Sequence, residues 1–322
     1  MRALRVYDSP EGRQLRMEEV PKPEPRPDQV LIRVRAIGVN RADLGRGRAA
    51  GGAAAEPFIP GLDAAGNIEA VGSEVKGWKA GDPVTAFLGR GYAEYAIARA
   101  VHVYPLPQGM NIVAAASIPC AFLTAWYGLT KLGEMKRGET VLVHAAGSGV
   151  GMAGVQIARA WGARVITSAG SDAKVARGLT LGAEAGVNYS TQDVAAELQR
   201  LTQGKGVDVV LDSVGGPVFD ATMKALAPGG RVVTPGGPAG PRGPVDEQAL
   251  AARGQKVMGI RIGDEAALDE QQKGWAQLKA WFESGAIRTV VDRIMPWGQA
   301  EEALRVLGDR AVFGKIVLTV DR

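Results

Sequence analysis

Residues 139–171 read ETVLVHAAGSGVGMAGVQIARAWGARVITSAGS, and this stretch decides the fold class. Thr140–His144 is a nearly continuous apolar run, which is typical of a strand buried on both faces of a sheet. Small residues follow at 145–151, and then a run with an apolar face of helical period that stops at Gly162. A second strand begins at Arg164. The stretch therefore predicts a strand, a glycine-rich turn, a helix and another strand, which is half of a dinucleotide-binding unit.

The glycine-rich turn is the first candidate site. Gly149, Gly151 and Gly154 form a GxGxxG pattern, which is weak evidence alone and stronger inside a complete strand, turn, helix and strand. Small residues let backbone N–H groups approach a pyrophosphate at the positive end of the helix dipole. A tight turn without a ligand is the alternative interpretation. We predict that the cofactor is bound here by Ala146, Gly147, Ser148, Gly149, Val150 and Gly151.

The composition narrows the classes of function. The chain has 322 residues, of which 46% are hydrophobic, enough for two domains with cores. One cysteine, Cys120, excludes an internal disulfide, and with only His102 and His144 besides it we expect no metal site. The net charge of +4 is scattered, so no nucleic-acid partner is predicted. No apolar run is long enough to cross a bilayer, and the N-terminal residues lack an apolar signal core, so we expect a cytoplasmic protein without a membrane partner.

The hydrophobic period changes along the chain and indicates an α/β protein with two domains. From Met1 to about residue 118, short strands punctuated by Gly and Pro predict a compact, partly open β-barrel. From 119 to 263, helices alternate with buried strands, which predicts a doubly wound parallel sheet. We expect residues 264–322 to return to the first domain and make it discontinuous. The strands predicted for the sheet are Thr140–His144, Arg164–Ser168, Gly186–Tyr189, Val207–Asp212, Arg231–Thr234 and Lys256–Ile262.

Several motifs together resemble one known family. VLVHAAGSGVGMAGVQIARAWGA (141–163) resembles the cofactor turn of the medium-chain dehydrogenase/reductase superfamily, and more narrowly of its zinc-independent quinone oxidoreductase branch, which includes zeta-crystallin. The resemblance implies a GroES-like catalytic domain at 1–118 and 264–322, a Rossmann NADPH-binding domain at 119–263 and a homodimer. The other motifs appear in family order over nearly the whole chain: GVNRAD (38–43), PGLDAAGNIEAVG (60–72), KAGDPV (79–84), AEYA (93–96), LTAWYGL (123–129), DVVLDSVGG (208–216) and FGKIVL (313–318).

The sequence departs from the zinc-dependent branch of that superfamily at the metal ligands. Asn40 and Leu62-Asp63 stand where that branch has a cysteine and a His-Glu pair, and the four-cysteine structural lobe is missing. The resemblance therefore implies an enzyme without zinc. His144 and Asp212 are each interpreted as structural residues at strand ends.

The segment after the second strand of the unit predicts the cofactor. Residues 168–171 contain no Asp or Glu to bind a ribose 2′-OH, which favours NADPH over NADH. Ser171 and Lys174 lie one helical turn apart, so both could reach a 2′-phosphate. We interpret Asp172 as the helix N-cap. The alternative for Lys174 is a solvated helix lysine. With the resemblance added, the predicted phosphate site is Gly170, Ser171, Lys174 and Tyr189.

The remaining site residues follow from the resemblance. Asn40 and Thr124 are expected to position the nicotinamide and the substrate, and no acid or base is assigned. Further cofactor contacts are expected at the carboxyl ends of strands, where Rossmann ligands bind. These contacts are Tyr127, Val214, Gly215, Gly236, Gly237, Ile262 and Lys315.

The expected chemistry is hydride transfer to an activated acceptor. Without a zinc ion to polarise a carbonyl, an acceptor that already stabilises negative charge is favoured, such as a quinone or an α,β-unsaturated carbonyl. An enoyl-thioester reductase acting on a CoA or carrier-protein substrate is one alternative. Arg46 and Arg48, in the loop Gly45–Glu56, could recognise such an anion. The favoured interpretation is that both arginines are charges exposed to solvent. A catalytically silent NADPH-binding protein is the other alternative.

Overall fold

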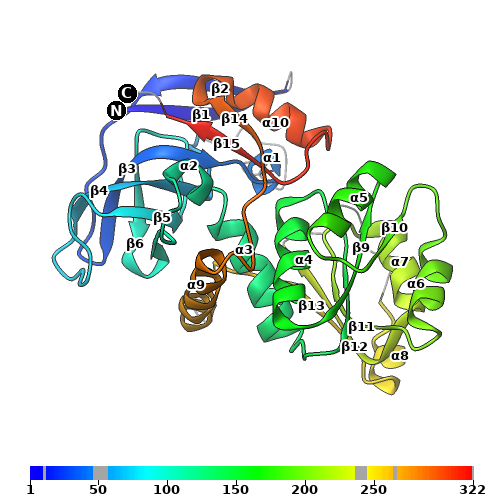
Figure 1. The fold of residues 1–322 in the computed structure, drawn as a ribbon. Coiled ribbons are helices and arrows are strands. Elements are labelled where there is room, and N and C mark those ends of the chain that lie inside the picture. Colours follow the sequence, from blue (N-terminus) through cyan, green and yellow to red (C-terminus); the bar gives the residue numbers. More distant parts are fainter. Residues whose placement is uncertain (10–11, 46–56, 236–244, 264–266, 321–322) are drawn as a thin grey trace. The chain divides into compact units, whose positions relative to one another are not determined.

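The computed structural model describes residues 1–9, 12–45, 57–235, 245–263 and 267–320 (Figure 1). The chain divides into two compact units, one formed by Met1–Cys120 with Thr289–Arg322 and the other by Ala121–Arg288. The first unit therefore consists of two separate segments of the chain, as does the first domain expected from the sequence. Within the described residues, no helix has the length and apolar character needed to cross a membrane.

The first unit is built from two sheets. A hairpin of β1 (Arg2–Ser9) and β2 (Gly12–Glu19) forms the small one. The larger sheet has the order β14-β15-β3-β4-β5-β7, with β6 paired to β3, and only its β14–β15 pair is parallel. Its strands are β3 (Gln29–Gly38), β4 (Asp63–Val71), β5 (Pro83–Phe87), β6 (Tyr95–Arg99), β7 (Val103–Pro105), β14 (Val291–Pro296) and β15 (Lys315–Thr319). Short helices accompany them: α1 (Ala42–Gly45), η1 (Ala100–His102), α2 (Ile112–Ala115), η4 (Trp297–Gln299) and α10 (Ala300–Gly308).

Strand β3 holds the first unit together. Val30, Leu31, Ile32 and Val34 are buried, whereas Arg33 is exposed. Gly38, at the end of β3, pairs with Asp63 on β4 at one side and with Val317 on β15 at the other. The last strand of the chain thus lies directly against an early one, and this arrangement positions the candidate site described below.

The second unit is a Rossmann fold. Its parallel sheet has the order β10-β9-β8-β11-β12-β13, which is strand 3-2-1-4-5-6 in chain order. The strands are β8 (Thr140–Val143), β9 (Arg164–Ala169), β10 (Ala185–Asn188), β11 (Val207–Leu211), β12 (Leu226–Pro235) and β13 (Lys256–Ile260). The helices are α3 (Pro119–Trp126), η2 (Tyr127–Leu132), α4 (Gly149–Trp161), α5 (Asp172–Thr180), α6 (Val194–Thr202), α7 (Gly216–Lys224), α8 (Glu247–Ala252) and α9 (Leu268–Glu283).

The predicted fold class is confirmed. Most strand ends differ from the predicted ones by one residue at most, and three differences are larger. β12 begins at Leu226 and not at Arg231, and β13 ends at Ile260, before the predicted Ile262. Tyr127–Leu132 forms a π-helix that the sequence pattern did not predict. Helices of this type are rare and occur often at functional sites.

The second unit also extends further than the predicted boundary at residue 263, because α9 packs within it. A Cβ on Gly274 would lie 2.6 Å from the Trp126 ring, so the helix backbone touches that indole directly. The Phe122 and Phe282 rings lie with centroids 4.9 Å apart. These contacts keep α9 in the second unit, and the chain returns to the first unit at Thr289.

Candidate functional site

The glycine-rich turn joins β8 to α4 at the centre of the parallel sheet. Ser148 is the N-cap of α4, and its hydroxyl accepts a hydrogen bond of 2.9 Å from the backbone N–H of Gly151. A Cβ on Gly151 would lie 2.1 Å from the carbonyl oxygen of Ala145, so no larger residue fits without moving the turn. A Cβ on Gly154 would lie 2.5 Å from the Leu211 side chain. Both glycines therefore permit close approach, in the turn and between α4 and the sheet.

The turn lies where a Rossmann sheet binds its ligand. β8 pairs with β9 on one side and with β11 on the other, so the strand order reverses at this strand. Val214 and Gly215 follow β11 at the same edge, and both backbone N–H groups donate to Asp212 Oδ1, at 2.8 and 3.0 Å. Asp212 thus has the structural role at the strand end that the sequence indicates.

The predicted phosphate residues follow two neighbouring strands. Gly170 and Ser171 follow β9, and Tyr189 follows β10, which pairs with β9. A Cβ on Gly170 would lie 3.1 Å from the Tyr189 hydroxyl, so the phenol covers this glycine. Lys174 lies in the first turn of α5, and its backbone N–H donates to Ser171 Oγ at 3.4 Å. The structure therefore gathers these four residues around the β9–α5 connection.

The prediction that Asp172 is the N-cap of α5 is wrong. Ser171 is the N-cap, with extended backbone angles, and Asp172 is the first residue of the helix. The Asp172 carboxylate accepts a hydrogen bond of 2.7 Å from the Asn188 side-chain amide. Asn188 therefore holds this negative charge at the end of β10.

A buried polar cluster in the first unit contains Asn40, Asp63 and Lys315. Pairing at Gly38 brings the three together, since Asn40 follows β3, Asp63 begins β4 and Lys315 begins β15. The Lys315 Nζ atom lies 2.5 Å from Asn40 Oδ1 and 3.3 Å from Asp63 Oδ2. The Asn40 Nδ2 atom donates to Asp63 Oδ2 at 2.9 Å and to the Gly38 carbonyl at 3.0 Å. Asp63 has no exposed surface, and Lys315 is 3% exposed.

A second buried carboxylate, Asp43, lies beside this cluster. Its Oδ2 atom accepts from the Asn40 backbone N–H at 2.8 Å and from the Tyr92 hydroxyl at 3.2 Å. Its Oδ1 atom is buried and has no hydrogen-bond partner among the described residues. Burial raises the pKa of the Asp43 carboxyl to about 6, although the Asn40 N–H and the Lys315 charge oppose the shift. Burial also raises the pKa of Asp63, again against the charge of Lys315.

Three other predicted site residues, Thr124, Tyr127 and Ile262, lie in the second unit. Thr124 is buried in α3, Tyr127 begins the π-helix η2, and Ile262 follows β13, where its carbonyl accepts a hydrogen bond from the Gln271 side chain. Gly236, Gly237, Arg46 and Arg48 lie outside the described residues.

Sequence reasoning missed the part that Asp63 plays. The sequence analysis names Asp63 only because it stands where the zinc-dependent branch has a metal ligand. In the structure its carboxylate binds the side chains of Asn40 and Lys315. Its position inside PGLDAAG was the available signal, because a charged residue in an otherwise apolar strand is seldom buried without a partner.

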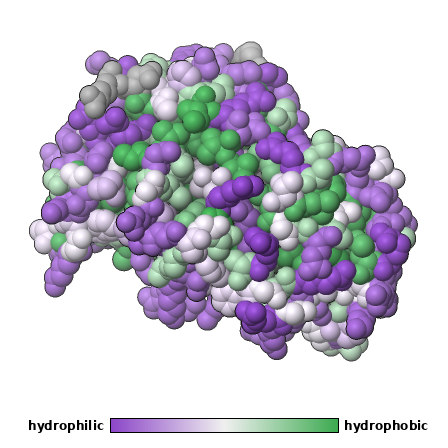
Figure 2. Space-filling view, in the orientation of Figure 1, coloured by the Kyte–Doolittle hydropathy of each residue, from purple (hydrophilic) through white to green (hydrophobic). Residues whose placement is uncertain are grey.

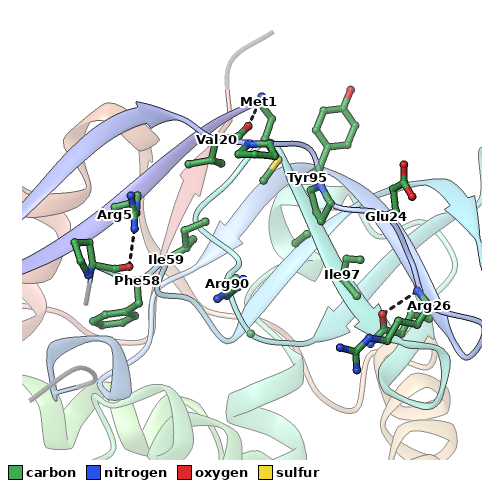
Figure 3. Close-up of a pocket in the computed structure, with 16 residues that line it drawn as sticks. Met1, Arg5, Val20, Glu24, Arg26, Phe58, Ile59, Arg90, Tyr95 and Ile97 are labelled. Atoms are coloured by element: carbon green, nitrogen blue, oxygen red, sulfur yellow. Dashed lines mark hydrogen bonds between the residues drawn. The ribbon is translucent and has the colours of Figure 1, made fainter. Parts of the chain in front are cut away.

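A cavity lies elsewhere in the first unit. Its volume is about 730 Å³, and Arg5, Arg26 and Arg90 line it with apolar residues such as Ile59 and Ile97 (Figure 3). None of the predicted site residues lines this cavity. On the face drawn in Figure 2, hydrophilic residues are spread over both units and form no single patch.

Two family models match the chain. The model described as "Alcohol dehydrogenase GroES-like domain" matches residues 26–108, and the model described as "Zinc-binding dehydrogenase" matches residues 149–282. Among the described residues, no three or more His, Cys, Asp or Glu side chains lie together as a metal site requires.

Known proteins resemble the chain over its whole length. A quinone oxidoreductase of Sus scrofa is 33% identical over 326 residues, which cover 99% of this chain and 97% of that protein. The structure of mycobacterial Rv1454c complexed with NADPH has a TM-score of 0.90 and 33% identity, over 99% of this chain and 100% of that one. The CurK enoyl reductase has a TM-score of 0.86 and 28% identity, over 99% of each chain.

Proposed function

The chain belongs to the quinone oxidoreductase branch of the medium-chain dehydrogenase/reductase superfamily, and from this premise we propose that it is an NADPH-dependent reductase of quinones or α,β-unsaturated carbonyls. The observation that carries the proposal is the Ser148–Gly151 turn at the carboxyl end of the central strand β8. Its close backbone packing fits a pyrophosphate at the N-terminus of α4.

We propose that the residues of the chain bind and orient the reactants. NADPH, when bound, supplies the hydride that reduces the acceptor, and a proton from solvent completes the product. Ser171, Lys174 and Tyr189 would hold the 2′-phosphate, which distinguishes NADPH from NADH. Asn40 and Thr124 would position the reacting groups, and such placement contributes strongly to the rate of hydride transfer.

The proposed reaction uses no zinc. Asn40 and Asp63, which stand where the zinc-dependent branch has metal ligands, lie together with Lys315 in the buried cluster. The ammonium group of Lys315 bonds to oxygen atoms of both other residues, so the cluster already contains a buried cation. An amide, a carboxylate and an ammonium do not form the N/S ligand set that zinc prefers.

Reduction of an enoyl thioester is a second candidate. It is supported by the likeness to the CurK enoyl reductase, which covers 99% of this chain. Both reactions add a hydride to a carbon conjugated with a carbonyl, so the same cofactor site serves either of them.

We propose that the protein acts as a homodimer in the cytoplasm. Strand β13 lies at the end of the parallel sheet and pairs only with β12 within the described chain. An unpaired edge of this kind can add a strand from a second copy. Sedimentation of the purified protein at several concentrations tests the dimer.

Stopped-flow oxidation of NADPH with a panel of acceptors tests the proposed function. We expect turnover with 9,10-phenanthrenequinone. Turnover with crotonyl-CoA alone would favour the enoyl-thioester reaction. Tight NADPH binding without oxidation by any acceptor would contradict both reactions and identify a catalytically silent binding protein.

A further inference from the structure

We propose that Lys315 is a positioning residue that fixes the side-chain amide of Asn40, so that Asn40 presents a hydrogen-bond acceptor to the reacting groups. The inference rests on the proposed function in one respect, namely that Asn40 touches the nicotinamide or the acceptor. It assigns Lys315 a role different from direct binding of the cofactor.

The two ends of the Asn40 amide face groups of opposite charge. Its oxygen, Oδ1, faces the Lys315 ammonium at 2.5 Å, and its nitrogen, Nδ2, faces Asp63 Oδ2 at 2.9 Å. An ammonium only donates hydrogen bonds, and a carboxylate only accepts them. A rotation of the amide by 180° would place its N–H groups against the ammonium and its oxygen against the carboxylate. The Lys315–Asp63 ion pair therefore permits one orientation of the amide and opposes the other.

The surroundings make this preference strong. Asp63 is fully buried, and Lys315 and Asn40 are 3% and 8% exposed, so little water reaches the three groups. Hydrogen bonds to charged groups are stronger than neutral ones and gain further where water is excluded. The Cys120 backbone N–H donates to Asp63 Oδ1 at 2.7 Å and holds the carboxylate in place.

The fixed orientation determines which hydrogen bonds Asn40 has left to offer. Its two N–H groups are used by Asp63 Oδ2 and by the Gly38 carbonyl. Its oxygen has two lone pairs, of which Lys315 takes one. Asn40 therefore has no donor for a substrate carbonyl, but it has one acceptor site. The fitting partner is an N–H or O–H group, such as the carboxamide of the nicotinamide or a hydroxyl on the acceptor.

The position of Lys315 favours this role over direct contact with a cofactor phosphate. Two of its three N–H groups bond to Asn40 and Asp63. Moving the ammonium out to a phosphate would leave the carboxylate of Asp63 buried without its ion pair, which is strongly unfavourable.

A double-mutant cycle between Lys315→Met and Asn40→Ala tests the proposal. We expect Lys315→Met to lower kcat about 10- to 100-fold, as misplacement of a positioning group does, and to change the Kd for NADPH less than about twofold. In the Asn40→Ala background, the same change is expected to lower kcat less than about twofold, because its effect passes through Asn40. Multiplicative effects on kcat, or an NADPH Kd raised about tenfold in both backgrounds, would overturn the proposal.

Lys22→Met is the matched control for the loss of a lysine. Lys22 lies on the surface of the same unit and pairs with Glu69 at 2.7 Å. If Lys315→Met does not fold, the double variant Lys315→Gln/Asp63→Asn replaces the ion pair by two neutral amides. Neutral amides permit both orientations of Asn40, so we expect the same loss of kcat. Wild-type kcat in this variant would overturn the proposal.

A measurement without turnover separates this inference from the proposed function. The side-chain amide signals of Asn40 in NMR spectra are assigned from their absence in Asn40→Ala. In the wild-type protein we expect two well separated proton signals that exchange slowly with water, and in the neutral double variant faster exchange. Unchanged signals would overturn the role of Lys315. Failure of the wild-type protein to oxidise NADPH with any acceptor would contradict only the proposed function.

Discussion

The imidazole of His144 donates a hydrogen bond from Nε2 to the hydroxyl of Thr222, 2.9 Å away. The direction follows from Thr222, whose own hydrogen goes to the Val218 carbonyl at 2.7 Å. Burial lowers the pKa of the ring and favours its neutral form, in which Nδ1 accepts a hydrogen bond from the Ser168 hydroxyl at 2.6 Å. His144 is therefore a neutral ring that joins the end of β8 to β9 and α7.

This neutral ring makes the stability of the second unit depend on pH. Burial lowers the pKa of His144 from its usual 6.5, although the Asp212 charge opposes the shift. Below about pH 6.5 the unfolded chain binds a proton that the folded one does not, so the free energy of unfolding falls as the pH falls. Urea unfolding at pH 8 and at pH 5.5 measures the change. In His144→Ala this dependence is expected to disappear, together with about 2–4 kcal/mol of stability at pH 8. Equal pH dependence in both proteins would contradict the assignment.

Asp43 is expected to have the opposite effect at lower pH, where the free energy of unfolding should fall as the pH rises. Its pKa in the folded protein is about 6, above the usual 3.8, so the folded state binds the proton more readily. Stability is then lost as the pH rises from about 4 to 6, by up to roughly 3 kcal/mol. Asp43→Asn is expected to remove this loss, because a neutral amide does not titrate. Thermal unfolding of both proteins at pH 4.5 and pH 7 gives the comparison, and parallel curves would show that Asp43 does not titrate in this range.

The glycine-rich turn is expected to tolerate no side chain at Gly151. A Cβ there would lie 2.1 Å from the Ala145 carbonyl oxygen, so Gly151→Ala must displace the turn. We expect NADPH affinity, measured by quenching of protein fluorescence, to fall at least tenfold, and stability to fall by about 1–3 kcal/mol. Gly298→Ala is the control, since a Cβ at that position meets nothing within 4 Å. If Gly151→Ala and Gly298→Ala had equal effects, the close approach of a Cβ to the Ala145 carbonyl oxygen would not be the cause of the loss.

Lys174 is expected to decide between the two nicotinamide cofactors. Lys174→Ala should raise KM for NADPH about tenfold and leave KM for NADH within twofold, because only NADPH has a 2′-phosphate to bind. Steady-state kinetics with both cofactors measures the difference. A matched loss with NADPH and NADH would defeat the assignment of the phosphate site.

The sequence alone predicts the parts of the molecule that depend on neighbouring residues. The strand, turn and helix around Gly151 form one continuous segment, so their pattern predicts both the sheet and the cofactor turn. The choice of N-cap at α5 is harder, since Ser171 and Asp172 are both favourable N-caps, and only the backbone angles of Ser171 select it.

Contacts between distant residues could not be predicted in the same way. Nothing near Asn40 in the sequence indicates that Lys315 binds its side chain, because the two are 275 positions apart. The assignment of α9 to the second unit depends on such a contact as well. The packing of α9 depends on the contact between Gly274 and the Trp126 ring. The sequence around either residue does not indicate that the two are in contact.

The distance along the chain between Asn40 and Lys315 also has a consequence for folding. Their contact closes a loop that contains the entire second unit. Closing a loop of disordered chain costs entropy that grows with its length, and contacts at such separation slow folding. Prior folding of the second unit would bring residues 121 and 288 to fixed positions and shorten the loop that remains. We therefore expect the Rossmann unit to gain protection from hydrogen exchange earlier than β15, so that the polar cluster around Asn40 is among the last parts of the molecule to form.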